Sequence, residues 1–575
     1  MKKAMLALTA VVAVISLTRC GGSSSNTPAV TVTPATANVQ EGSTQQFSAT
    51  VTNSADMAVN WTVNGMAGGN STVGTISGTG LYTAPDVIPS PSSVTVTATL
   101  QVNSAISGNG IVTVTSVVFN NSSLKGNYIF SLTGIDASGF AFYAVGTVTA
   151  DGNGNITGGE EDLNDANSGY FQASSVTGTY SVGADGRGVM SLNSSIGSFQ
   201  YAIAMRALSN AGLNEIDNQV TNAIGNLEQQ TAGVGAPSGS YAYGFSGSNG
   251  GCGPLSSAGL FSLSSGNVGG LQDLNCGGTI SQSQALSGNF GGIDGLGRGT
   301  GSFSSGSGLS SGFVYYVVSA NRFRFMGLTA GTLFLGAADL QTQPSFANTD
   351  FTGSYVVNNA GNSTLGVAYS LIQFNASNGS VSSGYYDVNN TGIVASSALS
   401  GAYSLGANGY VNGSFTVSGA SLPFSIYLSS PSSGYYVDLR SNVVGGGSVY
   451  GQSSGVTTNA AWAGSYATKQ FGYYIVGGVI SPGNSNSISG QISADGNGNL
   501  AGTLDINGPT TVVQGQTLQG TYSVGSVAPG RTTLTITTQA IGTQSYVAYI
   551  VSPTQVLLLE TDTNLTASGD AIRQF

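Results

Sequence analysis

The stretch TGTYSVG, residues 177–183, decides how most of this chain is organised, because versions of it recur at long and regular spacing. The related stretches are SGNFGG (287–292), SGAYSLG (400–406) and QGTYSVG (519–525). A second signature, Gly-x-Tyr, opens each copy, and its tyrosines are Tyr128, Tyr241, Tyr355 and Tyr466. The glycines of this second signature lie 113, 114 and 111 residues apart. The repeat is therefore as long as a domain, and too long for one propeller blade.

Turn signals divide each repeat into short segments. Gly, Asn, Ser and Asp clusters come roughly every 8 to 12 residues, and helical periodicity is absent. This pattern predicts about eight antiparallel strands in up-and-down order, and each repeat ends in a strand that closes on glutamine, such as Gln229 or Gln452. A sandwich and a barrel both fit the pattern. The barrel is favoured because closure removes exposed strand edges.

The predicted fold class is all-β, with an N-terminal Ig-like β-sandwich followed by four antiparallel barrel or sandwich units. The units are expected to be separate globular bodies in series. Their predicted bounds are 123–231, 236–343, 349–453 and 461–575.

Composition excludes several classes of function. The 575 residues include 87 glycines and no histidine, and only 6% of them are charged. The net charge of -11 argues against a protein that follows the phosphates of nucleic acid. Hydrophobic residues make up 40% of the chain, which is enough for packed domains.

The N-terminus has the pattern of an export signal. Two lysines precede the apolar segment 4–18, which is too short for a usual membrane span. The following LTRC (17–20) resembles the lipobox of bacterial lipoproteins, in which the cysteine is lipidated and becomes the first mature residue. Arg19 departs from that pattern, where a small residue is expected. The resemblance implies lipidation of Cys20 and export to the outer membrane or cell surface, whereas an ordinary secretory signal would release the protein. The signal peptide would span 1–19 and a flexible tether 20–27.

The next segment resembles a known domain family. The stretches VTVTPATANVQEGSTQQFSATV (30–51), VNWTVNG (59–65) and GTISGTGLYTAP (74–85) resemble the bacterial Ig-like group 2 domain. The resemblance implies an Ig-like sandwich over 28–117, with Trp61 in its core and a spacer or adhesive role. A surface binding role for Trp61 is the alternative.

Two cysteines fall within the second repeat. Cys252 and Cys276 are 24 positions apart, and in an oxidising compartment such a pair is most simply a disulfide. A two-thiolate metal site is the alternative, but without histidine it lacks further ligands. The sequence therefore predicts a disulfide, with no metal site and no cofactor.

One carboxylate recurs in every repeat. GEEDLN, GLQDLN, GYYDVN and GTLDIN align, which places Asp162, Asp273, Asp387 and Asp505 at one position. Strand alternation puts this Asp and the following Asn on one face and the residue between them on the other. A structural role would use backbone hydrogen bonds or the arginines of the GRG motif, for which the third repeat has a tyrosine. A repeated cation or ligand site is the functional alternative. The arginines and the tyrosine are Arg187, Arg298, Arg531 and Tyr410.

The loop just before the first of these carboxylates has DxNxN spacing. ADGNGN (150–155) recurs at 494–499, but the two middle repeats have no acid there. A loop that needed calcium for its shape could not lack the carboxylate in half of its copies. The pattern therefore favours a hairpin turn over a calcium site.

The function classes that remain are binding and structure. Without histidine, and without a repeated pair of acids, the sequence predicts no enzyme. Tyrosine doublets, such as Tyr315–Tyr316, are expected to place one ring outward, where it could stack on glycans. The prediction is an adhesive or carbohydrate-binding module array with glycans or surface proteins as partners. A passive spacer is the alternative, and the long repeats argue against one outer-membrane barrel.

Overall fold

The chain forms two compact units, Met1–Ser116 and Val117–Phe575. The structure is a computed structural model and describes residues 27–85, 88–217, 222–306, 310–329 and 331–575. The predicted signal peptide, Cys20 and nearly all of the predicted tether lie outside the described residues. The two units are described separately below.

The first unit consists of short strands around one core. β1 pairs with β4, a second sheet has the order β2-β11-β10-β5-β6, and a third has the order β3-β9-β8-β7. Trp61 is buried in the core, as the sequence predicts. The Ig-like assignment of this unit stays a prediction. The strands are β1 (Ala29–Thr33), β2 (Thr36–Gln40), β3 (Thr44–Gln46), β4 (Ser48–Thr52), β5 (Val59–Val63), β6 (Met66–Ala67), β7 (Gly69–Asn70), β8 (Gly74–Ile76), β9 (Leu81–Thr83), β10 (Ser93–Leu100) and β11 (Ser107–Thr115).

The second unit contains the four repeats, each of which folds as a closed barrel of antiparallel strands in up-and-down order. Barrel 1 consists of β12 (Lys125–Ile135), β13 (Ala141–Asp151), β14 (Asn155–Asp165), β15 (Gly169–Ser175), β16 (Thr177–Val182), β17 (Arg187–Asn193), β18 (Ser198–Ala207), β19 (Asn210–Glu215) and β20 (Asn222–Gln229). Barrel 2 consists of β21 (Gly239–Asn249), β22 (Gly253–Ser264), β23 (Asn267–Cys276), β24 (Thr279–Ile293), β25 (Arg298–Ser305), β26 (Ser310–Ser319), β27 (Arg322–Gly327) and β28 (Thr332–Leu340).

Barrel 3 consists of β29 (Gly353–Ser363), β30 (Gly366–Ser377), β31 (Ser380–Asn390), β32 (Ile393–Leu405), β33 (Tyr410–Val417), β34 (Ala420–Ser430), β35 (Ser433–Asp438) and β36 (Val443–Gly451). Barrel 4 consists of β37 (Ala463–Val476), β38 (Val479–Asp495), β39 (Asn499–Asn507), β40 (Val512–Val524), β41 (Arg531–Thr538), β42 (Gly542–Ser552), β43 (Gln555–Glu560) and β44 (Leu565–Arg573). Three short 3-10 helices accompany the barrels: η1 (Asn121–Ser123), η2 (Asn348–Asp350) and η3 (Asn459–Ala461).

The choice between barrel and sandwich is settled by strand pairing. In barrels 2 to 4 the first strand pairs with the last, so no edge is left open. Barrel 1 closes through the pairing of β13 with β14, and β14 also pairs with both β15 and β16. These two strands occupy the place of one long strand, β24, β32 or β40, in the other barrels. The predicted barrel and its up-and-down order are confirmed.

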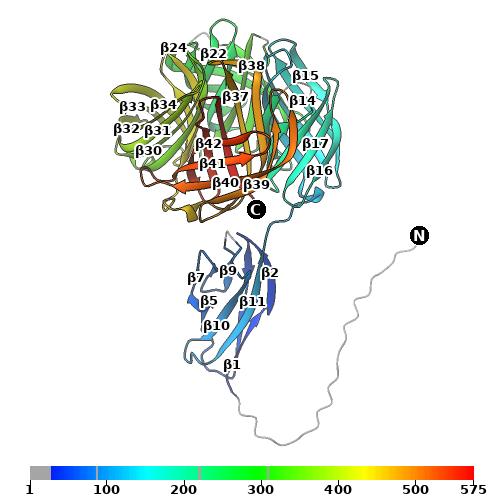
Figure 1. Cartoon of the computed structure of the whole chain (residues 1–575), viewed down its shortest axis with the longest axis vertical. Helices are drawn as coiled ribbons and strands as arrows, with labels where there is room; N and C mark the ends of the chain where they lie inside the picture. Colours follow the sequence, from blue (N-terminus) through cyan, green and yellow to red (C-terminus); the bar gives the residue numbers. More distant parts are fainter. Residues whose placement is uncertain (1–26, 86–87, 218–221, 307–309, 330) are drawn as a thin grey trace, which may run out of the picture. The chain divides into compact units, whose positions relative to one another are not determined.

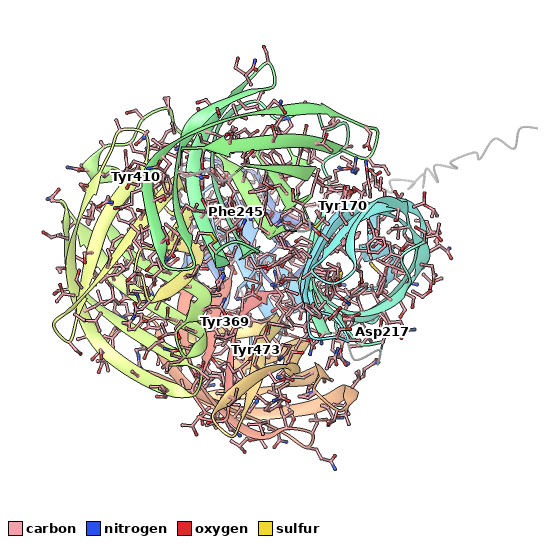
Figure 2. All side chains as sticks on the ribbon, turned by 90° about the horizontal axis from the view of Figure 1, so that it is seen from above. Tyr170, Asp217, Phe245, Tyr369, Tyr410 and Tyr473 are labelled. Carbon is pink, nitrogen blue, oxygen red and sulfur yellow. A yellow bond between two sulfur atoms is a disulfide. The ribbon has the colours of Figure 1, made fainter. Side chains whose placement is uncertain are left out.

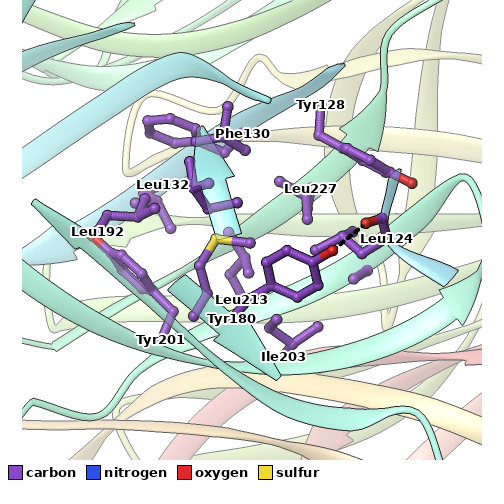
Figure 3. Packing of buried hydrophobic residues seen from close by; sticks show 14 of the residues in the cluster. Leu124, Tyr128, Phe130, Leu132, Tyr180, Leu192, Tyr201, Ile203, Leu213 and Leu227 are labelled. Atoms are coloured by element: carbon purple, nitrogen blue, oxygen red, sulfur yellow. Dashed lines mark hydrogen bonds between the residues drawn. The ribbon is translucent and has the colours of Figure 1, made fainter. Parts of the chain in front are cut away.

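The tyrosine signatures are explained by the barrel cores. Figure 3 shows Tyr180, from the stretch TGTYSVG, packed in the core of barrel 1 beside Tyr128 and Leu227. Its hydroxyl donates a 2.7 Å hydrogen bond to the carbonyl of Leu124, which directly follows η1. Tyr403 and Tyr522 make the same bond in barrels 3 and 4. The repeated tyrosine ring therefore fills these three barrels while its hydroxyl satisfies a backbone acceptor.

The four barrels pack against one another in a ring, which Figure 1 shows in the colours of the sequence and Figure 2 shows from above. The sequence predicted separate units in series, but residues 117–575 form one compact unit. Apolar clusters join barrels 1 and 2 around Tyr316, barrels 2 and 3 around Tyr435, and barrels 3 and 4 around Tyr549. The outer faces of these strands are apolar, and burying them stabilises the assembly by roughly 25 cal/mol per Å².

Candidate functional site

Each repeated aspartate lies at the interface with the next barrel. Asp162 accepts two hydrogen bonds from Arg298 of barrel 2, from Nε at 2.7 Å and from Nη2 at 2.9 Å. The hydroxyl of Tyr316, also in barrel 2, donates to the same carboxylate at 2.6 Å. Burial and the adjacent Asp162 raise the pKa of Tyr316 well above its usual range, so the hydroxyl stays a donor. The carboxylate is fully buried, and its fork-to-fork pairing with arginine is a strong and specific geometry.

The same contact recurs around the ring. Asp387 of barrel 3 is paired with Arg531 of barrel 4 at 2.9 and 2.7 Å. Asp505 of barrel 4 is paired with Arg187 of barrel 1, at 2.6 Å between Oδ1 and Nη2. The first and last repeats of the chain are therefore neighbours, and the ring is closed.

Barrel 3 contributes a tyrosine instead of an arginine. Asp273 of barrel 2 accepts a 3.1 Å hydrogen bond from the hydroxyl of Tyr410, the residue that the sequence places at the arginine position. The backbone N–H of Ser283 also donates to Asp273. All four aspartates thus bind the following barrel. The sequence found the right partner types, but the pairing joins neighbouring repeats.

Two further side chains of each repeat reinforce the ring. The Asn two positions after each aspartate donates to backbone carbonyls of the next barrel, and so does the glutamine just after the last strand of each repeat. The asparagines are Asn164, Asn275, Asn389 and Asn507, and the glutamines are Gln230, Gln341, Gln452 and Gln574. In the first repeat the interface residue is Gln230, one position after the Gln229 that the sequence pattern indicated. These contacts account for the recurring motif through assembly of the ring.

The tyrosines that were expected to face solvent are covered. None of the 26 tyrosines in the sequence is exposed. Tyr315 lies inside barrel 2, whereas Tyr316 points outward into the interface with barrel 1. Likewise, Tyr435 packs against barrel 2 and donates to Asp339 at 2.7 Å. The prediction of solvent-facing tyrosine rings for glycan stacking is wrong, because a neighbouring barrel covers the outer strand faces.

The DxNxN loops are built as turns. In the first, Asp151 Oδ1 accepts from the backbone N–H groups of Asn153 and Asn155, at 2.6 and 3.0 Å. These bonds, together with one from the Asn155 side chain, lower the pKa of Asp151 to about 2. Asp495 makes the same contacts in barrel 4. The carboxylates are thus directed at their own backbone, as in Asx turns.

The two cysteines of the second repeat form the disulfide that the sequence predicts. Cys252 and Cys276 form a disulfide in barrel 2, with their Cα atoms 5.6 Å apart. Cys276 ends β23, and Cys252 lies in the turn before β22. The bond therefore staples two neighbouring strands at one end of the barrel.

A cavity of about 680 Å³ lies between the barrels and is the best candidate for a ligand site. All four barrels line it. Tyr143 of barrel 1, Tyr369 of barrel 3 and Tyr473 of barrel 4 contribute aromatic rings, and Figure 2 labels the last two near the middle of the ring. Burial raises the pKa of Tyr143 to about 12. The size matches that of small-molecule sites.

Three residues of the cavity wall carry buried polar atoms without partners in the described part of the chain. Ser256, Asn358 and Gln470 line it, and Ser256 and Gln470 are only 2% and 3% exposed. Among the described residues, no hydrogen bond reaches Ser256 Oγ, Asn358 Oδ1 or Gln470 Oε1. A buried polar group without a partner costs about 1–3 kcal/mol.

Charged residues converge on the same place. The chain has 13 basic residues, three of which precede Cys20. Of the remaining ten, Lys469 and Arg324 line this cavity or the one beside it, and Arg206 and Arg322 belong to the ion pairs next to them. Three acids accompany them. Arg206 pairs with Asp570 at 2.6 Å and Arg324 with Glu228 at 2.6 Å, while Arg322 lies 3.5 Å from Glu228 and 3.4 Å from Asp339. The fourth base is Lys469, for which no ion pair with a described residue is found within 4.0 Å.

The sequence offered few signals for this cavity. Its residues come from the outer faces of strands in all four repeats, and many of them are at equivalent repeat positions. Thr133, Ser246, Ala360 and Phe471, for example, each lie five residues after the opening tyrosine of their repeat. Another signal was the placement of the scarce charges Arg324 and Lys469 within strands. Charges in the middle of otherwise apolar strands indicate a buried polar site, because they are rarely buried without partners.

Comparisons with known proteins add little. No protein-family model matches the chain, and no curated protein matches it. Among solved structures, the chain is similar to a point mutant of transferrin binding protein B, a vaccine antigen from Haemophilus parasuis. The identity is 9%, the match covers 64% of this chain and 84% of that one, and the TM-score is 0.16.

Two searches of the described residues bear on membranes and metals. None of the helices there has the length and apolar character needed to cross a bilayer. The same residues contain no cluster of three or more His, Cys, Asp or Glu side chains suited to a metal.

Proposed function

We propose that this protein is an exported, lipid-anchored surface protein that binds a carbohydrate in the cavity between its four barrels. The carbohydrate-binding role expected from the sequence thus moves from the outer strand faces to the centre of the ring. The role is binding without catalysis. Lipidation of Cys20 would hold the protein at the cell surface, and the segment that resembles an Ig-like domain would act as a spacer or adhesive module.

The observation that carries this proposal is the chemistry of the cavity wall. Sugars present both apolar ring faces and hydroxyl groups, and the wall offers tyrosine rings beside amide and hydroxyl groups. The serine and asparagine side chains of the wall, such as Ser246, Asn358 and Asn362, provide groups that can exchange hydrogen bonds with sugar hydroxyls. The cavity is lined by strands of all four barrels within one compact unit, which favours preorganised binding.

A glycan array followed by calorimetry on the purified full chain tests the proposal. We expect saturable binding of a short oligosaccharide that weakens when Tyr369 or Gln470 is replaced by alanine. Phe171→Ala, on the exposed surface of barrel 1, is the control and should bind normally. Absence of binding across the array, or binding insensitive to both cavity variants, would instead favour the passive spacer.

A further inference from the structure

We propose that the carbohydrate bound in the cavity is acidic and that Lys469 holds its negative group. This inference rests on the proposed function and names the class of ligand. It is carried by the geometry of a cluster of seven charged residues, of which Lys469, Arg324 and Asp570 line the cavity or the one beside it.

This cluster contains one more basic residue than acidic residues. Four bases, Arg206, Arg322, Arg324 and Lys469, meet three acids, Glu228, Asp339 and Asp570. Each acid lies within 4.0 Å of an arginine. Arg324 and Arg322 overcome the effect of burial and lower the pKa of Glu228 to about 2, so this acid is ionised at neutral pH. One positive charge is therefore left over in a protein whose net charge is -11.

The positive charge without an acidic partner among the described residues is that of Lys469. This residue lies in a wall that two neighbouring cavities share. Lys469 lines both the 680 Å³ cavity and an adjoining one of about 250 Å³. Its aliphatic stem packs beside Gly212 of barrel 1, and this contact limits the conformations of the side chain. Arg324 lines the adjoining cavity as well.

The environment of Lys469 favours an anion. Burial lowers the pKa of its ammonium group, and Arg206 and Arg324 lower it further, while Asp570 and Glu228 act in the opposite direction. Since Asp570 is already bonded to Arg206, an added anion is the group that would satisfy the ammonium. A carboxylate or a sulfate on a sugar supplies that charge, and the oxygens of the cavity wall remain available for hydroxyls.

Calorimetry on the full chain with four probes tests the inference. The probes are digalacturonate, its neutral methyl ester, sulfated lactose and lactose. We expect the charged member of at least one pair to bind more tightly, with a loss of about 10- to 100-fold in affinity for Lys469→Met. Lys469→Arg should restore most of that affinity. Lys125→Met, which removes an exposed lysine in barrel 1, is the control and should bind normally.

The outcomes separate the two proposals. Preference for digalacturonate identifies a carboxylate, and preference for sulfated lactose identifies a sulfate. If the neutral probes bind as well as the charged ones, or if Lys469→Met binds the charged probes normally, the acidic ligand is ruled out while carbohydrate binding stands. If none of the four probes and no glycan of the array binds, the proposed function itself fails.

Discussion

At the residue scale, the repeated aspartate is a connector between barrels. Asp162 is fully buried and is held by Arg298 and Tyr316 of the next barrel. Removing one partner of a buried ion pair leaves the other charge uncompensated, which costs about 3–5 kcal/mol. Asp162→Asn should therefore lower the free energy of unfolding by about that amount, as measured by urea titration followed by tyrosine fluorescence.

A turn carboxylate in the same barrel is the matched control. Asp151→Asn loses the charge but keeps an oxygen that can accept the turn hydrogen bonds of Asn153 and Asn155, so stability at neutral pH should fall much less than in Asp162→Asn. Equal effects of the two substitutions would contradict the connecting role of Asp162.

Glu160 makes the interface of barrels 1 and 2 sensitive to pH. Burial and the adjacent Asp294 raise its pKa to about 7, with Asp162 adding to the rise and Arg298 opposing it. The pKa is therefore higher in the folded state than in the unfolded one, near 4.5, and stability is lost as the pH rises from about 4.5 to 7.

The prediction concerns the pH dependence of the melting temperature. Glu160→Gln, which cannot ionise, should flatten that decline between about pH 4.5 and 7, whereas Asp185→Asn on the exposed surface should not. A parallel decline in Glu160→Gln and the wild type would show that Glu160 stays ionised.

The sequence located these residues better than it explained them. Strand alternation correctly placed Asp162 on one face and Leu163 in the barrel core. It could not tell what covers the outer face, so Tyr316 was expected in solvent although it lies in an interface. Burial by a distant repeat leaves no local pattern in the sequence.

At the element scale, the barrel was predictable because its determinants are local. Turn residues mark the strand ends, and the tyrosine signatures pack in each core. The split of one long strand into β15 and β16 in barrel 1 was not predictable. The break falls at Val176, whereas Ala173, with a positive φ of 45°, forms a bulge inside β15 as Ser283 does inside the unbroken β24.

The disulfide stabilises barrel 2. It closes a loop of 24 residues between neighbouring strands, and such a link stabilises by about 3 kcal/mol. Cys276→Ser should therefore lower the melting temperature of the full chain in calorimetry. A reductant should have a similar effect on the wild type and none on the variant. No response to the reductant would mean that the bond is dispensable for the barrel.

At the scale of the whole molecule, the ring was the feature that sequence analysis missed. Runs such as VYYVV (314–318) are apolar at successive positions, which indicates strands buried on both faces. Inside a small barrel only one face is buried by the core. The second apolar face therefore signals contact with another body, and in this chain that body is the neighbouring repeat.

Closure of the ring involves the two ends of the second unit. Gln574 donates to the carbonyls of Asp185 and Met205 in barrel 1, and the N–H of Phe575 bonds to Arg206. Arg187 and Asp505 meet at the same interface although they are 318 positions apart. In a series of separate units these two residues would have no contact.

A double-mutant cycle on Arg187 and Asp505 is the most direct test of the closed ring. The free energy of unfolding is measured by urea titration for the wild type, Arg187→Ala, Asp505→Ala and the double variant. A closed ring predicts that the double variant loses at least about 1 kcal/mol less than the sum of the single losses. Losses that add to within about 0.5 kcal/mol would show that the first and fourth barrels do not touch.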